Sequence, residues 1–216
     1  MIPQQQRSPA WFKWRQSRIG ASDAAIILGV NNFKSIGQLL DEKLGTRPPE
    51  EENAAMKRGN DYEEKARLAF ENETGHVVFP QVCVHPEYDW MVASLDGMTI
   101  EKDIVVEIKC PGMMVAHETF KFRKIPEYYI PQLQHQMAVT GVDKIYYYSF
   151  FEGGGACEKF TCLITCERDQ SFIDNMIEKE KQFYNLLIQG KGLLECFESD
   201  VERLKDQVYK ILEVKE

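Results

Sequence analysis

The sequence predicts an α/β fold in which helices flank a mixed central β-sheet. Helix-like segments with capping residues lie towards both ends of the 216-residue chain. Short apolar runs bounded by turn residues, which are typical of strands, occupy its middle. Because helical stretches separate these runs into two groups, we expect a mixed sheet with helices packed against it.

Three helices are expected before the sheet, over residues 22–28, 36–44 and 54–73. Ser22 or Asp23 can cap the first helix, because a short side-chain oxygen accepts a hydrogen bond from a free backbone N–H. The remaining elements are expected in this order: strands at 76–84, 91–100 and 104–110, helices at 113–122 and 131–139, strands at 144–151 and 158–165, and helices at 170–189 and 197–214.

We expect a single domain over residues 1–216, because no strong linker divides the chain. A helical part of about residues 1–75 should pack on a sheet core of about 76–166, and helices over about 170–214 should follow. The richest break, residues 46–53, holds two prolines and three glutamates and is predicted to be a loop.

The net charge of −8 is unusual for a protein that binds nucleic acid, but the basic residues are concentrated. Up to Arg18 the chain has four basic residues and no acid, and three more lie within 121–124. A surface formed by these basic residues can bind phosphates even if the rest of the protein is acidic. The alternative is that each basic group lies on an ordinary solvated face. Without an apolar signal core or a membrane-length run, we expect a soluble cytoplasmic protein.

Six cysteines are present, and Cys157, Cys162 and Cys166 suggest an iron–sulfur cluster. Their spacing lacks the tight Cys-x2-Cys pairs of ferredoxin-like ligand sets. Cys162 also falls in an expected strand, where a small apolar side chain packs well. Free structural cysteines are therefore the prediction.

The most informative segment is Glu107-Ile108-Lys109-Cys110-Pro111, which ends an apolar run. Side chains alternate along a strand, so Glu107 and Lys109 share one face and Ile108 points to the other. A buried strand rarely carries two charges on one face unless they are paired or bind a metal. A structural Glu–Lys pair on an exposed face is the alternative.

Asp96 lies in the preceding predicted strand, which a turn near residues 101–103 joins to this one. A hairpin centred on this turn sets Asp96 opposite the region of Ile108. Its carboxylate is then within reach of Glu107 and Lys109. Carboxylate oxygens are the ligands that a hard divalent cation prefers, and such a cation activates water and neutralises charge on a phosphate. Together with a lysine that orients water or stabilises the transition state, the set predicts phosphodiester hydrolysis.

Asp96…Glu107-x-Lys109 has the form of the core motif of PD-(D/E)xK nucleases, with Leu95 where that pattern often has proline. Further segments resemble one branch of that superfamily, the phage lambda-type exonucleases (YqaJ-like viral recombinases). These segments are Arg18-Ile19-Gly20-Ala21-Ser22-Asp23, Arg58-Gly59-Asn60-Asp61-Tyr62-Glu63, Ser94-Leu95-Asp96-Gly97, and Gln132-Leu133-Gln134 with Val139-Thr140-Gly141.

The resemblance implies a restriction-endonuclease-like nuclease domain with Mg²⁺-dependent 5′-to-3′ exonuclease activity. Such an enzyme digests one strand of linear double-stranded DNA to mononucleotides and leaves 3′ single-stranded DNA for recombination by strand annealing. The resemblance also implies two metal ions, for which Mn²⁺ can substitute, and a ring-shaped homotrimer. A single-strand annealing protein is the implied partner, in a prokaryotic or phage-infected cell, and no membrane is involved.

The resemblance and the chemistry together give each residue an expected role. Asp96 and Glu107 are expected to hold one Mg²⁺, with the Ile108 carbonyl as a further ligand. Glu63 is expected to share a second Mg²⁺ with Asp96, whereas a solvated helix carboxylate is its alternative role. Lys109 is expected to orient or deprotonate the attacking water.

Gln132 best matches the family's glutamine that orients the water or the scissile phosphate, and Gln136 shares its helix face. Arg18 and Ser22 flank the first predicted helix, where backbone amides and a guanidinium suit a phosphate. The resemblance implies that this place anchors the 5′-phosphate. The alternative for the glutamines is that they are polar residues on a solvent-exposed helix face. The alternative for Ser22 and Arg18 is a helix cap beside a surface arginine.

Other interpretations stay open at the level of the sequence. Trp11 and Trp14 interleave with basic residues and can stack on a DNA end, but core or interface packing is the more frequent role of such aromatic groups. A DNA endonuclease of the same superfamily shares the metal site. A non-catalytic DNA-end-binding protein on the same fold is the second alternative.

Overall fold

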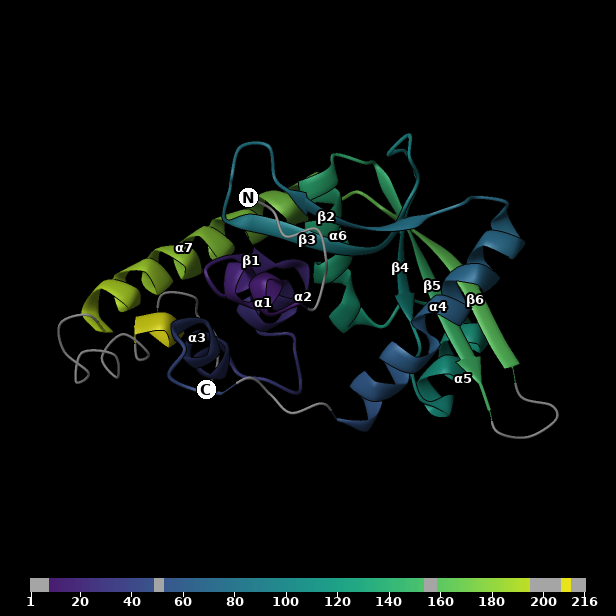
Figure 1. Ribbon diagram of the computed structural model, residues 1–216, viewed down its shortest axis with the longest axis horizontal. Coiled ribbons are helices and arrows are strands. Elements are labelled where there is room, and N and C mark those ends of the chain that lie inside the picture. Colours follow the sequence, from purple (N-terminus) through teal and green to yellow (C-terminus); the bar gives the residue numbers. More distant parts are fainter. Residues whose placement is uncertain (1–7, 49–52, 154–158, 195–206, 211–216) are drawn as a thin grey trace.

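The computed structural model describes residues 8–48, 53–153, 159–194 and 207–210. Within these ranges a six-stranded mixed sheet has the order β1-β3-β4-β5-β6, and β2 pairs with β3. Helices lie on both sides of this sheet (Figure 1). The predicted α/β class with a mixed central sheet is confirmed.

The elements have the following bounds: α1 (Pro9–Gln16), β1 (Ile19–Gly20), α2 (Ala21–Ile27), α3 (Ile36–Leu44), α4 (Ala54–Thr74), β2 (Phe79–Val84), β3 (Met91–Met98), β4 (Val105–Lys109), α5 (Met113–Phe122), the 3₁₀ helix η1 (Glu127–Tyr129), α6 (Ile130–Thr140), β5 (Lys144–Glu152), β6 (Lys159–Glu167) and α7 (Gln170–Leu194). The sequence did not predict α1, β1 or η1. Most of the helix predicted over 197–214 lies outside the described residues.

Strand β3 has two partners along one of its edges and one partner along the other. Strand β2 runs antiparallel to β3 from Val92 to Met98. The opposite edge pairs with β1 at Met91 and Val92 and with β4 at Gly97 and Met98. Residues 93–96 therefore lie between β1 and β4 on that edge, and Asp96 directly precedes the first residue paired with β4.

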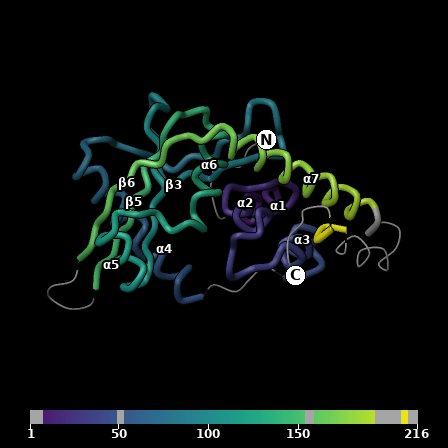
Figure 2. The backbone as a smooth tube through the Cα atoms, turned by 180° about the vertical axis from the view of Figure 1, so that it is seen from behind, coloured from purple at the N-terminus to yellow at the C-terminus, as the bar shows by residue number. Residues whose placement is uncertain are grey.

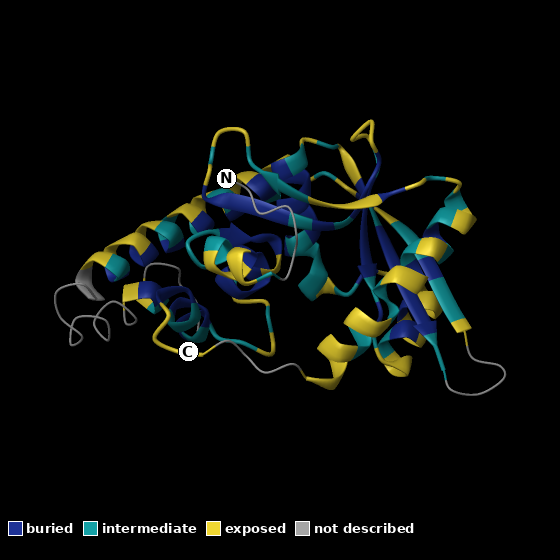
Figure 3. Ribbon diagram, viewed as in Figure 1, coloured by how far each residue is buried: buried dark blue, intermediate teal, exposed yellow. Residues whose placement is uncertain are grey.

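Two apolar clusters hold the helices against the sheet. The larger cluster joins α2, α3, α6 and α7 to strands β3 and β5. The smaller cluster packs Ala66 and Phe70 of α4 on Val106 and Ile108 of β4. Figure 3 shows these strands as largely buried between the layers. Because Val106 and Ile108 face α4, the alternation of the strand leaves Glu107 for the side covered by α6.

The N-terminus of α2 differs from the prediction, because Gly20 is the capping residue rather than Ser22 or Asp23. Asp23 instead occupies the third position of the helix, and its carboxylate accepts a hydrogen bond from the Gly20 N–H at 2.8 Å. This is the backward half of a capping box. Ser22 is therefore an exposed residue of the first helical turn, and its hydroxyl is available to other partners.

The C-terminal helix α7 extends past α6, α2 and α3, as Figure 2 shows from behind. Among the described residues, none of the helices combines the length and the apolar composition that a membrane span requires. Cys162 and Cys166 are free, buried thiols of β6, whereas Cys157 lies outside the described residues.

Candidate active site

The β3–β4 hairpin brings Asp96 beside the charged end of β4. Its register pairs Gly97 with Val106, and one further step along the ladder sets Asp96 opposite Glu107. The Asp96 carboxylate accepts a hydrogen bond from the Ile108 N–H at 2.8 Å. The structure thus places Asp96 where the hairpin argument predicted it.

Three side chains hold the carboxylate of Glu107, which is only 2% exposed. Oε1 of Glu107 lies 2.6 Å from Nζ of Lys109 and accepts a hydrogen bond of 2.6 Å from the amide of Gln132. Oε2 accepts a hydrogen bond of 2.5 Å from the amide of Gln136. Glu107 and Lys109 share one strand face, as predicted, and they form an ion pair there. Both glutamines contact Glu107 from one face of α6.

Lys109 is held as an ammonium ion. Burial by itself lowers the pKa of Lys109, but the negative charge of Glu107 and the proximity of Tyr129 and Asp96 outweigh burial and raise the pKa above its ordinary value. The Nζ atom also lies 4.9 Å from the centre of the Tyr129 ring. An ammonium group carries three N–H donors, so Lys109 can donate to a water or to a phosphate oxygen.

A second group of charges lies on the α4 side of Asp96. The guanidinium of Arg67 donates to the Asp96 carbonyl oxygen at 3.0 Å and to Oε1 of Glu63 at 3.0 Å. Arg67 therefore ties the helix of Glu63 to the strand of Asp96. Burial raises the pKa of Asp96 well above its usual value, and the negative charges of Glu107 and Glu63 raise it further.

Converging negative charges of this kind suit a divalent cation. Like charges converge at a poorly solvated place, where a cation removes their mutual repulsion. Carboxylate oxygens are also the donors that Mg²⁺ prefers. Among the described side chains, no group of three His, Cys, Asp or Glu residues is arranged as a metal site. Ligation of metal by Asp96, Glu107, Ile108 and Glu63 therefore stays a prediction.

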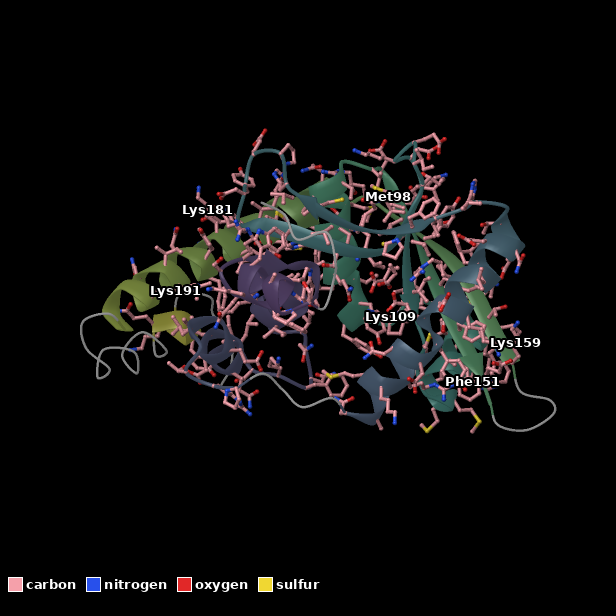
Figure 4. All side chains as sticks on the ribbon, in the orientation of Figure 1. Met98, Lys109, Phe151, Lys159, Lys181 and Lys191 are labelled. Atoms are coloured by element: carbon pink, nitrogen blue, oxygen red, sulfur yellow. The ribbon has the colours of Figure 1, made fainter. Side chains whose placement is uncertain are left out.

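One cavity of about 420 Å³ joins this carboxylate group to the N-terminal helices. Lys109, labelled in Figure 4, lies between those helices and α4. One part of the lining consists of the predicted site residues Glu63, Asp96, Glu107, Ile108, Lys109 and Gln132. Trp11, Arg15, Gly20 and Ser22 line another part of the same cavity. All predicted site residues except Arg18 contribute to this lining.

Arg15 and Ser22 form a cationic corner in the cavity. A guanidinium nitrogen of Arg15 donates a short hydrogen bond to the Ser22 hydroxyl. The guanidinium lies over the Trp11 ring, 5.1 Å from its centre, and an added Cβ on Gly20 would lie 2.9 Å from the Arg15 Nε. Gly20 therefore leaves the space that the guanidinium occupies.

Arg18, which the sequence predicted to accompany Ser22, points elsewhere. Its guanidinium donates to the carbonyl oxygen of Trp14 at 3.1 Å and to that of Asp89 at 3.3 Å. It also lies 4.6 Å from the centre of the Trp14 ring. The arginine that contacts Ser22 is Arg15, and the phosphate-binding role predicted for Arg18 stays a prediction.

Comparison with known proteins now identifies the domain. The family model of the YqaJ-like viral recombinase domain matches residues 10–143. The chain belongs to this family. The matched range begins in α1 and extends just beyond α6, so it includes both the carboxylate group and the cationic corner.

This YqaJ-like domain is similar to the uncharacterized protein YqaJ of Bacillus subtilis (strain 168). The two are 32% identical over 184 residues, which is 83% of this chain and 56% of the relative. The chain spans about half the length of the curated relatives that it matches.

Solved structures give the same fold. The YqaJ-like domain is 28% identical to an alkaline exonuclease (LHK-Exo) from Laribacter hongkongensis, with a TM-score of 0.71 over 94% of this chain and 100% of that chain. A complex of LHK-Exo with dAMP gives a TM-score of 0.72 over the same shares. A phage related exonuclease from Haemophilus somnus 129PT is 16% identical and shares the fold, with a TM-score of 0.63 over 80% of this chain and 95% of that one. Family and fold together support a nuclease role for the YqaJ-like domain.

Three residues of the site were absent from the sequence prediction or received no role there. Arg67 follows Glu63 by four positions on one helix, a spacing that signals a contact. Tyr129 lies in the unpredicted η1 beside Lys109. The only sequence feature that pointed to Arg15 was the local cluster of basic residues. The position of its side chain beside Ser22 depends on the pairing of β1 with β3.

Proposed function

We propose that this domain is a metal-dependent 5′-to-3′ exonuclease that digests one strand of linear double-stranded DNA to mononucleotides. The observation that carries this proposal is the presence in one cavity of Asp96, Glu107 and Lys109 together with the Arg15–Ser22 corner. A cationic corner beside a hydrolytic group can hold a terminal phosphate while the neighbouring phosphodiester is cut. The binding of dAMP by LHK-Exo supports a mononucleotide product.

Asp96, Glu107 and the Ile108 carbonyl would hold one Mg²⁺, and Glu63 and Asp96 would hold a second. Bound Mg²⁺ supplies a water of lowered pKa and neutralises charge that develops on the phosphate. Lys109 donates a hydrogen bond that orients the water or stabilises the charged transition state.

Gln132 lines the cavity and donates to Glu107. Its role in this proposal is to fix the Glu107 carboxylate and to contribute a polar contact for the water or the scissile phosphate. Gln136 is fully buried, so its role is confined to Glu107.

The 5′-phosphate is assigned to the Arg15–Ser22 corner. A guanidinium offers several N–H donors to a phosphate in a fixed planar fork, and the Ser22 hydroxyl adds another polar contact. Ser22 is retained from the sequence prediction, and Arg15 replaces Arg18 as the anchoring cation. Anchoring by the terminal phosphate selects DNA ends and sets the 5′-to-3′ direction.

The family further suggests a ring-shaped homotrimer around the DNA and a single-strand annealing protein that binds the 3′ strand. Light scattering on the purified domain tests the oligomer, and a monomeric mass at working concentration would contradict it. Co-purification with a single-strand annealing protein tests the partner.

The decisive test uses two linear duplexes, one labelled at a 5′ end and the other at a 3′ end. Each is incubated with Mg²⁺, with Mn²⁺ or with a chelator. We expect Mg²⁺-dependent release of labelled mononucleotide from the 5′-labelled strand. Covalently closed circular DNA is the control, because an exonuclease leaves it intact. Cleavage of the circle would favour the endonuclease alternative, and binding without turnover in any metal would favour a non-catalytic end-binding protein.

A further inference from the structure

A buried ion pair between Asp23 of α2 and Lys43 of α3 lies behind the cationic corner. Nζ of Lys43 is 2.6 Å from Oδ2 of Asp23, and each residue is only 6% exposed. Nζ also donates to the carbonyl oxygens of Arg18 at 2.6 Å and Arg15 at 3.4 Å. All three donors of the ammonium thus have acceptors within the protein.

Asp23 lies between two cations. One of its oxygens accepts from Lys43 and from the Gly20 N–H, while the other lies 3.7 Å from the Arg15 guanidinium. Burial raises the pKa of Asp23, but the charges of Lys43 and Arg15 outweigh burial and lower the pKa to about 2. Asp23 is therefore an anion that competes with any ligand for the charge of Arg15.

The charges of this group decide how strongly the corner attracts an anion. Two cations and one anion leave one net positive charge, and Arg15 is the cation that reaches the cavity. If Lys43 were neutral, Arg15 and Asp23 would balance each other and the corner would have no net charge. A buried ion pair often contributes nothing to stability or reduces it, compared with apolar side chains of similar size. The Asp23–Lys43 pair therefore calls for a functional explanation.

We propose that Lys43 is a positioning residue for a terminal phosphate: it neutralises Asp23 and so leaves the charge of Arg15 free to bind the phosphate. This inference rests on the assignment of the 5′-phosphate to the Arg15–Ser22 corner. Asp23 is retained in this arrangement because it caps Gly20, which places β1 and the start of α2. Lys43 thus compensates for a carboxylate that the local backbone needs.

A purely mechanical role for Lys43 makes a different prediction. Lys43 also fixes the backbone on either side of residues 16–17 through the Arg15 and Arg18 carbonyls. If these backbone hydrogen bonds were the function of Lys43, loss of its ammonium group would weaken phosphate binding with either Asp or Asn at position 23. If charge compensation is its function, removal of Asp23's charge makes Lys43 dispensable.

The experiment measures binding of a short duplex with a 5′-phosphate and of the same duplex with a 5′-hydroxyl, by fluorescence anisotropy in chelator. The readout is the ratio of the two affinities, so it requires no turnover. We compare the wild type with Lys43→Met, Asp23→Asn and the double variant, with Arg15→Gln as the reference for a lost anchor. Thermal unfolding establishes which variants are folded.

We expect Lys43→Met to lower the phosphate preference roughly tenfold, as the loss of one nearby partly buried charge implies. The double variant, which has a neutral pair of similar shape, should regain a preference near that of the wild type. Asp23→Asn keeps an oxygen for the Gly20 N–H and should retain the preference, which tests the proposal even if Lys43→Met does not fold.

Three results would overturn the inference: an unchanged preference in Lys43→Met, a loss in the double variant equal to that in Lys43→Met, or a loss in Asp23→Asn. A wild type that prefers the 5′-phosphate but does not digest DNA would leave the inference standing and refute the exonuclease. A wild type without any preference would refute the assignment of the phosphate to this corner, and the inference with it.

Discussion

The amide of Gln136 donates a 2.5 Å hydrogen bond to Oε2 of Glu107, and both side chains are buried. The other oxygen of Glu107 receives Lys109 and Gln132. A carboxylate with donors at both oxygens is fixed in orientation before any ligand binds.

Replacement of Gln136 by Leu should raise the Mg²⁺ concentration needed for half-maximal nuclease activity. The loss leaves Oε2 of Glu107 without its buried donor, and such supporting contacts typically change metal affinity by about tenfold or more. Gln134→Leu is the matched control, because Gln134 is equally buried on α6 but bonds Glu167 and Asp169 instead. Both variants should lose about 1–3 kcal/mol of stability, but only Gln136→Leu should change the response to Mg²⁺.

Replacement of Lys109 by Met should lower the turnover number about 10²- to 10³-fold, as expected when one preorganised donor to a transition state is lost. Duplex binding should change much less, since Arg15 and Ser22 are untouched. Single-turnover digestion of a labelled duplex measures the effect. A Lys109→Met enzyme that digests DNA at the wild-type rate would exclude Lys109 from the chemistry.

Replacement of Gly20 by Ala should displace the Arg15 guanidinium without unfolding the protein. The new methyl group would lie 2.9 Å from two Arg15 nitrogens, and the end of a long side chain can move aside. We expect the preference for 5′-phosphorylated over 5′-hydroxyl duplex to fall towards that of Arg15→Gln. Gly192→Ala is the control for fold and expression, because an added Cβ there meets no neighbouring atom and Gly192 does not line the cavity.

Asp23 should contribute to stability at neutral pH and lose that contribution in acid. Its pKa falls from 3.8 to about 2 on folding, so the unfolded chain binds more protons between these values and stability decreases as pH falls through them. The contribution amounts to roughly 2 kcal/mol above this window. Urea unfolding of wild type and Asp23→Asn should show a difference in free energy that is larger at neutral pH than near pH 3, and a constant difference would contradict the assignment.

The carboxylate group could be predicted from the sequence because its geometry is local. Alternation along β4 fixes the shared face of Glu107 and Lys109, and a short hairpin brings Asp96 to their level. Helical periodicity likewise predicts that Gln132 and Gln136 lie on one face. These rules need no knowledge of how distant segments pack.

The cationic corner could not be predicted in the same way. Arg15 and Arg18 are both basic, both near Ser22 in sequence and both beside tryptophans. The choice between them depends on β1, a two-residue strand that exists because it pairs with β3 some seventy positions later. Asp23 and Lys43 are also an ion pair between separate helices, for which the sequence offers no periodic signal.

The site lies where two separately packed bodies of apolar side chains meet across one sheet. Glu63 is supplied by the helix that packs with Phe70, whereas the glutamines that fix Glu107 belong to the helix that packs with Leu133. Both clusters contain residues of β4 and β5, so a small shift of α4 or α6 on these strands would change the spacing of the carboxylates. Hydrogen exchange of α4 relative to α6, with and without divalent cation, would show whether cation binding draws the two bodies together.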